Sequence, residues 1–321
     1  MSAGFKSRRY RYIKQARSNT KYFIGIDGGG TRTTAVVIDE TGQELRRLSG
    51  EAGIINVLEP EAGAHTLADL ASHALADARV TELPAALCCA LAGAGREHER
   101  VRLEQALSAL RIATRVHVVP DFTAALQDAF GDGPGILVIA GTGSSAWGRA
   151  ADGRCQRVGG WGHIIGDEGS GYAIGRVALM LAMREFDGRG EHARFMDAVL
   201  TQTKVVSEEG LVRWAAGASK GEVAALAPIV FDAAQHGALS AQDAIDDAAA
   251  ELAMHVAALY DRLGPWDQPP AVALAGGLIE PGRPLREPVL REIEALTIPV
   301  AIVEERIDAA RGAAALARAR G

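Results

Sequence analysis

The chain has 321 residues, of which 48% are hydrophobic and 23% are charged, and its formal net charge is −6. This length is enough for two domains, and the composition is that of a soluble globular protein rather than a disordered or fibrous one. There is no apolar run as long as a membrane span, and the acidic balance opposes a nucleic acid as the main partner.

The amino-terminal segment and the cysteines indicate where in the cell the protein is expected. Residues 1–20 are basic, contain no acidic residue and lack the apolar stretch of a secretory signal, so we expect a disordered arm. The alternatives for such an arm are nucleic-acid binding and organelle targeting. Cys88, Cys89 and Cys155 form neither a disulfide framework nor a zinc pattern, so a cytoplasmic location is expected.

The first strands flank a glycine-rich turn. Residues 22–48 predict three strands with a turn at 40–42, and the first turn consists of Asp27, Gly28, Gly29, Gly30 and Thr31. The glycines lead into a strand, so they fit neither a dinucleotide fingerprint nor a Walker motif. Glycine lets backbone N–H groups approach phosphate oxygens without a side chain in the way, so we expect a phosphate-binding turn. A plain tight hairpin is the alternative.

The rest of the first half alternates helices and strands. The expected elements are a helix over 61–78, a buried strand over 85–91, a helix over 99–110 with Val101, Leu103, Leu107 and Leu110 on its inner face, and a strand over 116–119. Asp121 then begins a helix. An aspartate at this place can take a proton from a substrate hydroxyl or cap the helix, and the two roles do not exclude each other.

A second glycine turn follows a segment rich in glycine and proline, which interrupt helices and strands. Residues 131–135 predict a domain boundary, and the strand–turn–strand pattern then recurs over 136–148. Its turn contains Thr142, Gly143 and Ser144, which would donate hydrogen bonds to a nucleotide from the other side. The recurrence predicts a duplicated α/β domain.

Phosphoryl transfer needs a positioned metal ion, and Asp27 would orient Mg²⁺ through water.

A loop over 159–171 contains six glycines, which exclude a regular strand or helix. We expect its backbone to lie close to a ligand. Trp161 offers a flat apolar face to a sugar ring, while Asp167 and Glu168 offer acceptors to hydroxyl groups. His163 is expected to order the loop rather than to take part in the chemistry.

The remainder of the chain is predicted to be mainly helical. Its expected elements are a helix over 172–186, a capping box at 219–222 before a long helix, a cap at Ser240 with Asp243 before a helix ending near Leu263, a strand over 272–275 stopped by Gly276 and Gly277, and a helix over 308–320.

These motifs together resemble one family. I-D-G-G-G-T, V-P-D-F-T-A-A, I-A-G-T-G-S, G-G-W-G-H-I-I-G-D-E-G-S-G and A-L-A-G-G-L are similar to motifs of the N-acetylglucosamine kinases of the BadF/BadG/BcrA/BcrD-type ATPase family, within the actin/hexokinase/Hsp70 superfamily. The resemblance runs from about Tyr22 to the carboxyl terminus. It implies two RNase H-like α/β domains around a cleft, 21–131 plus 307–321 and 132–306, with the last helix returning to the first domain.

The resemblance also implies the roles of individual residues. The residues expected to hold ATP and Mg²⁺ are Asp27, Gly28, Gly29, Gly30, Thr31, Thr142 and Gly143, with Gly276 and Gly277 beside the adenosine. The residues expected to contact the sugar are Asn56, Asp121, Gly160, Trp161, Asp167 and Gly171. Asp121 would be the base for the 6-hydroxyl group.

Several alternatives remain at this stage. Ala92 stands where animal N-acetylglucosamine kinases carry a serine, and bacterial glucosamine kinases of the family share this alanine, so free glucosamine is the second acceptor. Some family relatives are ATPase activators of radical dehydratases, but that role needs cysteine thiolates at a subunit interface. A non-enzymatic sugar sensor is a third possibility. The expected partner is a small amino sugar, and a homodimer is left open.

Overall fold

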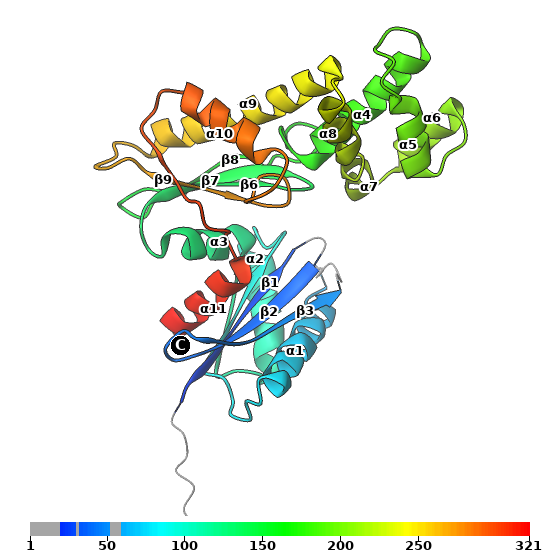
Figure 1. Ribbon diagram of the computed structural model, residues 1–321. Helices are drawn as coiled ribbons and strands as arrows, with labels where there is room; N and C mark the ends of the chain where they lie inside the picture. Colours follow the sequence, from blue (N-terminus) through cyan, green and yellow to red (C-terminus); the bar gives the residue numbers. More distant parts are fainter. Residues whose placement is uncertain (1–19, 30–31, 52–58) are drawn as a thin grey trace, which may run out of the picture.

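The computed structural model describes residues 20–29, 32–51 and 59–321, and is built on two five-stranded sheets (Figure 1). The first sheet has the order β3-β2-β1-β4-β5, with strands β1 (Tyr22–Gly28), β2 (Arg32–Asp39), β3 (Glu44–Glu51), β4 (Ala86–Leu91) and β5 (Arg115–Pro120). The second has the order β10-β9-β6-β7-β8, with strands β6 (Gly135–Ala140), β7 (Ser144–Arg149), β8 (Cys155–Gly159), β9 (Ala271–Ala275) and β10 (Ala301–Ile302).

The two sheets share one topology. In the first, β1 pairs antiparallel with β2 and parallel with β4. In the second, β6 pairs antiparallel with β7 and parallel with β9 in the same arrangement. The internal repeat predicted from the two glycine turns is therefore confirmed, and both turns lie at corresponding hairpins, β1–β2 and β6–β7.

Helices cover both faces of the first sheet. The helices on one face are α1 (Pro60–Asp77) and α2 (Glu97–Ala109), and those on the other are α3 (Asp121–Phe130) and α11 (Ala309–Arg320). Side chains alternate along a strand, so Ile24 and Ile26 of β1 pack toward α1 and α2, while Phe23 packs on the α11 side. The carboxyl-terminal helix thus returns to the first half, as expected.

Close approach of α11 depends on two glycines. A Cβ atom at Gly25 of β1 would overlap the backbone of Ala310 and Ala314 in α11. A Cβ atom at Gly312 of α11 would overlap the carbonyl oxygen of Ala124 in α3. The helix therefore packs backbone against backbone on β1 and α3, which any larger side chain at these two positions would prevent.

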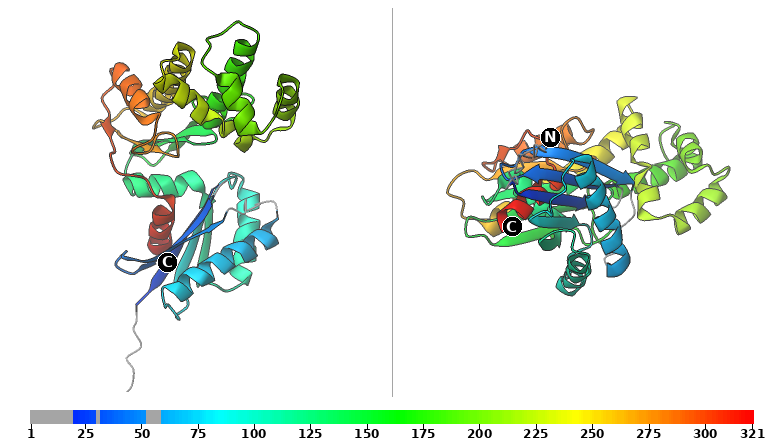
Figure 2. Two further views of the ribbon diagram at one scale, coloured as in Figure 1. Left: turned by 45° about the vertical axis from the view of Figure 1, so that its right-hand side comes forward. Right: turned by 90° about the horizontal axis from the view of Figure 1, so that it is seen from below.

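Helix α3 lies between the two sheets. Its Ala125 and Leu126 pack against Leu137 of β6 and Ala273 of β9 on the inner face of the second sheet. The outer face carries α9 (Leu239–Leu263) and α10 (Arg286–Ala295). The other helices of this half project to one side (Figures 1 and 2): α4 (Gly171–Phe186), α5 (Phe195–Thr203), α6 (Glu208–Gly217), α7 (Lys220–Ala224) and α8 (Ala227–Gln235).

Three details of the predicted helices are wrong. Val101 is 47% exposed, so the inner face of α2 is formed by Leu103 and Leu107 without it. The capping box at Ser219 forms, but α7 that follows it has five residues rather than being long. Ser240 is not the cap of α9, because the helix already begins at Leu239. The N–H groups of Leu239 and Ser240 donate hydrogen bonds to the carboxylate of Glu191 instead.

Two chain segments connect the halves, around 131–135 and before α11. Arg149 of β7 donates to the carbonyl oxygens of Gly131 and Gly133, which ties the first connection to the second sheet. The exact domain limits stay a prediction. No helix within the described ranges is long and apolar enough to cross a membrane.

Candidate active site

A cleft of about 910 Å³ lies between the two halves. The first half lines it with the turn after β4, residues 92–96, and with Asp121 and Phe122 at the start of α3. The second half contributes the β6–β7 turn, β8 and the start of α7. Six of the predicted site residues meet here, and they are Asp121, Thr142, Gly143, Ser144, Gly160 and Asp167.

Asp121 is the first helical residue of α3, where the parallel strand β5 ends. Pro120 occupies the N-cap position and no side chain caps the helix, so the capping role considered for Asp121 is not the one it has. Its Oδ1 accepts a hydrogen bond of 2.8 Å from the N–H of Phe122. Burial raises the pKa of Asp121, because the charged form is poorly solvated in the cleft wall. The raised basicity suits a proton acceptor.

Asp27 ends β1 beside the first glycine turn. Its pKa is raised to about 7, first by burial and then by the negative charges of Asp121 and Asp308. A nearby cation would stabilise the ionised form of a carboxylate in such surroundings. The structure describes no group of three or more His, Cys, Asp or Glu side chains arranged for a metal ion. Mg²⁺ needs only one or two carboxylates besides water and phosphates, so Asp27 fits the role predicted for it.

The first turn is only partly described. The N–H of Gly29 donates to the carbonyl oxygen of Arg32 at 3.1 Å, which closes the hairpin. Gly28 is the last residue of β1 and is buried. Gly30, Thr31 and the predicted sugar residue Asn56 lie outside the described residues.

The second turn is a tight hairpin closed by a hydrogen bond of 2.9 Å from the N–H of Gly141 to the carbonyl oxygen of Gly143. Ser144 is buried, and both of its donors are already used. Its N–H donates to Asp167 at 3.2 Å and its hydroxyl to the Glu168 carbonyl oxygen at 2.6 Å. Ser144 therefore ties the turn to the tryptophan loop (residues 159–171), while Thr142 is exposed at the tip.

The start of α4 supports the same turn. Gly171, predicted beside the sugar, donates its N–H to the carbonyl oxygen of Gly141 at 2.7 Å, and the N–H of Tyr172 donates to that of Thr142 at 3.2 Å. On the other side, Gly276 has a φ of +100°, and a Cβ atom at this position would overlap the backbone of Ala140 at the end of β6. The glycines after β9 therefore lie next to the second turn.

Asp167 has a partner that the sequence did not reveal. Its side chain is 4% exposed, and Oδ2 lies 2.6 Å from the Nζ of Lys220, which is 33% exposed and lines the cleft. The same ammonium group lies beside Gly143, where a Cβ atom would overlap it. Lys220 follows Ser219 in the predicted capping box, but nothing in that motif indicates contact with a residue so distant in sequence.

The tryptophan loop rests on α9. Gly159 packs over the ring of His255, and Gly169 packs on Leu252; both glycines have positive φ angles near +70°. Trp161 is 62% exposed. The ring of His163 contacts that of Tyr172 edge-on at 4.8 Å, which agrees with an ordering role.

Glu168 does not face the cleft. It lines a separate hollow between α4 and α9, so the expectation that it receives sugar hydroxyls is not met in this arrangement.

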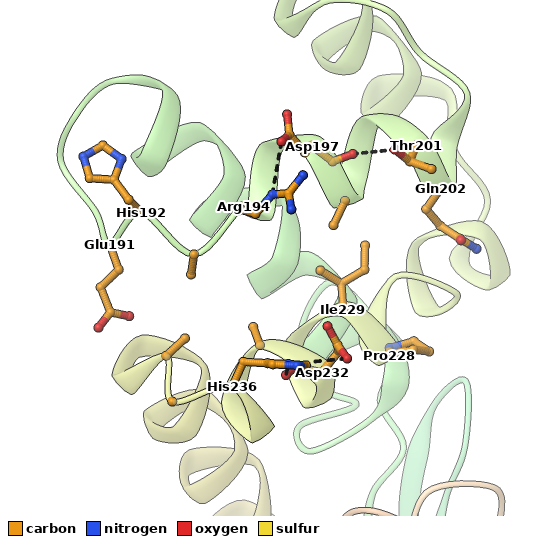
Figure 3. Close-up of a pocket in the computed structure, with 15 residues that line it drawn as sticks. Glu191, His192, Arg194, Asp197, Thr201, Gln202, Pro228, Ile229, Asp232 and His236 are labelled. Carbon is orange, nitrogen blue, oxygen red and sulfur yellow. Dashed lines mark hydrogen bonds and ion pairs between the residues drawn. The ribbon is translucent and has the colours of Figure 1, made fainter.

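A second cavity of about 910 Å³ lies among the helices of the projecting part (Figure 3). Its labelled polar side chains largely bond to one another or to helix ends: Arg194 pairs with Asp197, and His236 bonds to Asp232. It holds none of the predicted site residues. The two cavities have the same volume, but only the first is lined by the second glycine turn and by Asp121.

Comparisons with known proteins agree with this geometry. The model of the BadF/BadG/BcrA/BcrD ATPase family matches residues 24–317. An N-acetylmuramic acid/N-acetylglucosamine kinase of Clostridium acetobutylicum is 34% identical over 301 residues, covering 93% of this chain and 98% of the relative. A glucosamine kinase of Vibrio cholerae is 26% identical over 289 residues, covering 82% and 96%. The solved structure of a candidate N-acetylglucosamine kinase from Chromobacterium violaceum has a TM-score of 0.76 at 28% identity, covering 92% and 98%.

Proposed function

Because the chain belongs to the BadF/BadG/BcrA/BcrD ATPase family, we propose that it is an ATP-dependent kinase that phosphorylates the 6-hydroxyl group of N-acetylglucosamine. One observation carries the proposal. A half-buried aspartate of raised pKa and a glycine turn with a neighbouring lysine face the same cleft from opposite halves of the molecule. This arrangement can hold an acceptor hydroxyl on one side and a terminal phosphate on the other.

In the proposed reaction Asp121 accepts the proton of the acceptor hydroxyl. The hydroxyl oxygen forms a bond to the γ-phosphorus, the bond from that phosphorus to the bridging oxygen breaks, and ADP leaves. Asp27 would hold Mg²⁺ through water, and the ion would supply charge neutralisation at the phosphates. The positioning that the reaction needs comes from the two halves of the cleft.

The phosphates would be bound by Thr142, the backbone of Gly143 and the ammonium group of Lys220. The position of Lys220 beside Gly143 supports this, since a cation there neutralises phosphate charge. Ser144 would act indirectly, because its donors are bonded to the tryptophan loop. Gly276 and Gly277, next to the same turn, would border the adenosine.

The acceptor is proposed to be N-acetylated rather than a free amine. Glucosamine carries an ammonium group near neutral pH, and a desolvated ammonium needs a carboxylate partner. Asp167 is already paired with Lys220, and Glu168 faces away from the cleft. The exposed face of Trp161 suits an acetamido methyl group instead. Glucosamine remains the second acceptor to test.

The iron–sulfur alternative has no support in the cysteines. Cys88 and Cys89 are buried within β4, and burial raises the pKa of both thiols, to about 12 for Cys88. Such thiols resist becoming the thiolates that a cluster needs. Cys155 is exposed at the start of β8, far along the chain from this pair.

A coupled ADP-release assay with amino sugars and plain hexoses tests the proposal. We expect the highest kcat/KM for N-acetylglucosamine, a lower value for glucosamine and a far lower one for glucose. A preference for glucosamine would overturn the acceptor but not the kinase activity. ADP release that no sugar stimulates would contradict the kinase, and sugar binding without ADP release would indicate a sensor.

A further inference from the structure

An aromatic pair joins the two halves of the molecule in the wall of the cleft. The ring of Phe122 in α3 lies parallel to that of Trp147 in β7, with an interplanar angle of 6° and 3.4 Å between the ring centroids. Both side chains are half-buried and line the cleft. The pair therefore adds to the buried contacts of Ala125 and Leu126, at the end of α3 that faces the cleft.

Strand β7 holds both ends of α3. Trp147 and Arg149 are two residues apart, so their side chains lie on the same face of the second sheet. Trp147 meets Phe122 in the first turn of α3. Arg149 donates to the carbonyl oxygens of Gly131 and Gly133, just after the helix ends. One short strand of the second half thus fixes the position of a helix that begins with Asp121.

The orientation of the Asp121 carboxylate depends on the residue that this pair holds. Its Oδ1 accepts a hydrogen bond of 2.8 Å from the N–H of Phe122. Trp147 lies three residues after Ser144 of the second glycine turn, which is about 10 Å along the strand. Sliding of the two rings past each other would expose apolar surface to water, so the pair opposes such movement. It therefore fixes the distance between the carboxylate and the turn.

We propose that Trp147 is a positioning residue of this kinase, which acts through Phe122 to hold the Asp121 carboxylate at its working distance from the γ-phosphate. This inference rests on the function proposed above. A displacement of about 1 Å between reacting groups can lower a rate by about 100-fold. In this role Trp147 touches neither substrate, so its loss should lower kcat and leave the KM values unchanged.

The test measures kcat and both KM values with Mg·ATP and with N-acetylglucosamine or glucosamine as acceptor. Trp147→Leu should lower kcat by about 10–100-fold and leave each KM within about twofold of the wild type. Trp147→Phe keeps an aromatic ring and should recover most of the lost rate. The control is Trp266→Leu, at a half-buried tryptophan outside the cleft that packs near Tyr260, and it should leave kcat unchanged.

Double variants show whether Trp147 acts through Phe122 and Asp121. Phe122→Leu removes the other ring, so it should lower kcat as Trp147→Leu does, and the two changes together should cost no more than either alone. In the Asp121→Asn background, Trp147→Leu should change kcat by less than about twofold, because no base is left to position. Thermal unfolding of each variant checks that the fold is kept.

Three results would overturn the inference. The first is a normal kcat in Trp147→Leu, and the second is an equal loss of kcat with and without the Asp121 carboxylate. The third is a raised KM for the sugar at normal kcat. That result would place the role of Trp147 at the tryptophan loop, by way of the Arg157 guanidinium, whose carbon is 5.7 Å from the Trp147 centroid and 4.2 Å from that of Trp161. A wild type whose ADP release no amino sugar stimulates would instead refute the proposed function.

Discussion

At Asp121, replacement by asparagine removes the proton acceptor and keeps the size of the side chain. We expect Asp121→Asn to lower kcat by about 10²–10⁴, the usual contribution of a positioned base, with ATP binding and fold unchanged. Steady-state kinetics and nucleotide titration measure this. Asp267→Asn, at an exposed position of the loop after α9, is the control. A near-normal kcat in Asp121→Asn would remove the base assignment.

The pH dependence of kcat follows from the same carboxyl group. Asp121 must be ionised to act, and burial raises its pKa, so the rate should fall as the pH drops through that raised value. The acidic limb should therefore lie at higher pH than an ordinary aspartate would give. Measuring kcat at saturating Mg·ATP and sugar avoids contributions from binding. The absence of any acidic limb at this level would contradict the prediction.

Lys220 should matter for the nucleotide rather than the sugar. Lys220→Met removes the cation beside Gly143, and KM for Mg·ATP should rise by about 10–100-fold. The single variant also leaves the buried Asp167 without its partner, so the melting temperature should fall. Adding Asp167→Asn should restore stability without restoring ATP affinity. If the double variant recovered both stability and ATP affinity, the role of Lys220 would be limited to its ion pair with Asp167.

At the level of elements, the packing of α11 offers a sharp comparison of two glycines. Gly312→Ala places a methyl group against the backbone of Ala124 and should destabilise the protein by about 1–3 kcal/mol. Gly217→Ala in α6 meets open space and should be neutral or slightly stabilising. Chemical denaturation measures both. Equal effects would mean that α11 adjusts its position without cost.

Much of the element order could be predicted because it depends on local pattern. The strands around both glycine turns and the end of α9 at Leu263 follow from apolar runs and from breakers. The start of α9 could not be predicted, since its first N–H groups are bonded by Glu191 from another part of the chain. The length of α7 likewise depends on packing against its neighbours, which no capping motif specifies.

On the scale of the whole molecule, the cleft should narrow when the sugar binds. The connection at 131–135 is expected to serve as part of a hinge, although Arg149 holds its carbonyl oxygens to β7. Small-angle scattering should give a smaller radius of gyration with N-acetylglucosamine than without it. Sucrose at equal concentration controls for solvent contrast. An unchanged radius would mean that the cleft is already in its working form.

The site is assembled from two halves of the molecule, and contacts between these distant segments could not be predicted from the sequence. Motifs indicated Asp121, the second turn and the tryptophan loop, and the structure brings these into one cleft. The pairing of Asp167 with Lys220 was missed, and so were the contacts of the Arg157 guanidinium with the rings of Trp147 and Trp161. Both depend on contacts between distant segments, and a lysine or arginine in sequence carries no sign of its partner.

The return of α11 to the first sheet has a consequence for how the chain is made. On a ribosome, β1, β4 and their neighbours emerge long before the helix that covers Phe23, Cys88 and Ala90. Until α11 leaves the exit tunnel, α3 is the one described helix that covers part of this apolar face. The amino-terminal half therefore completes this part of its core only after the second half has been synthesised.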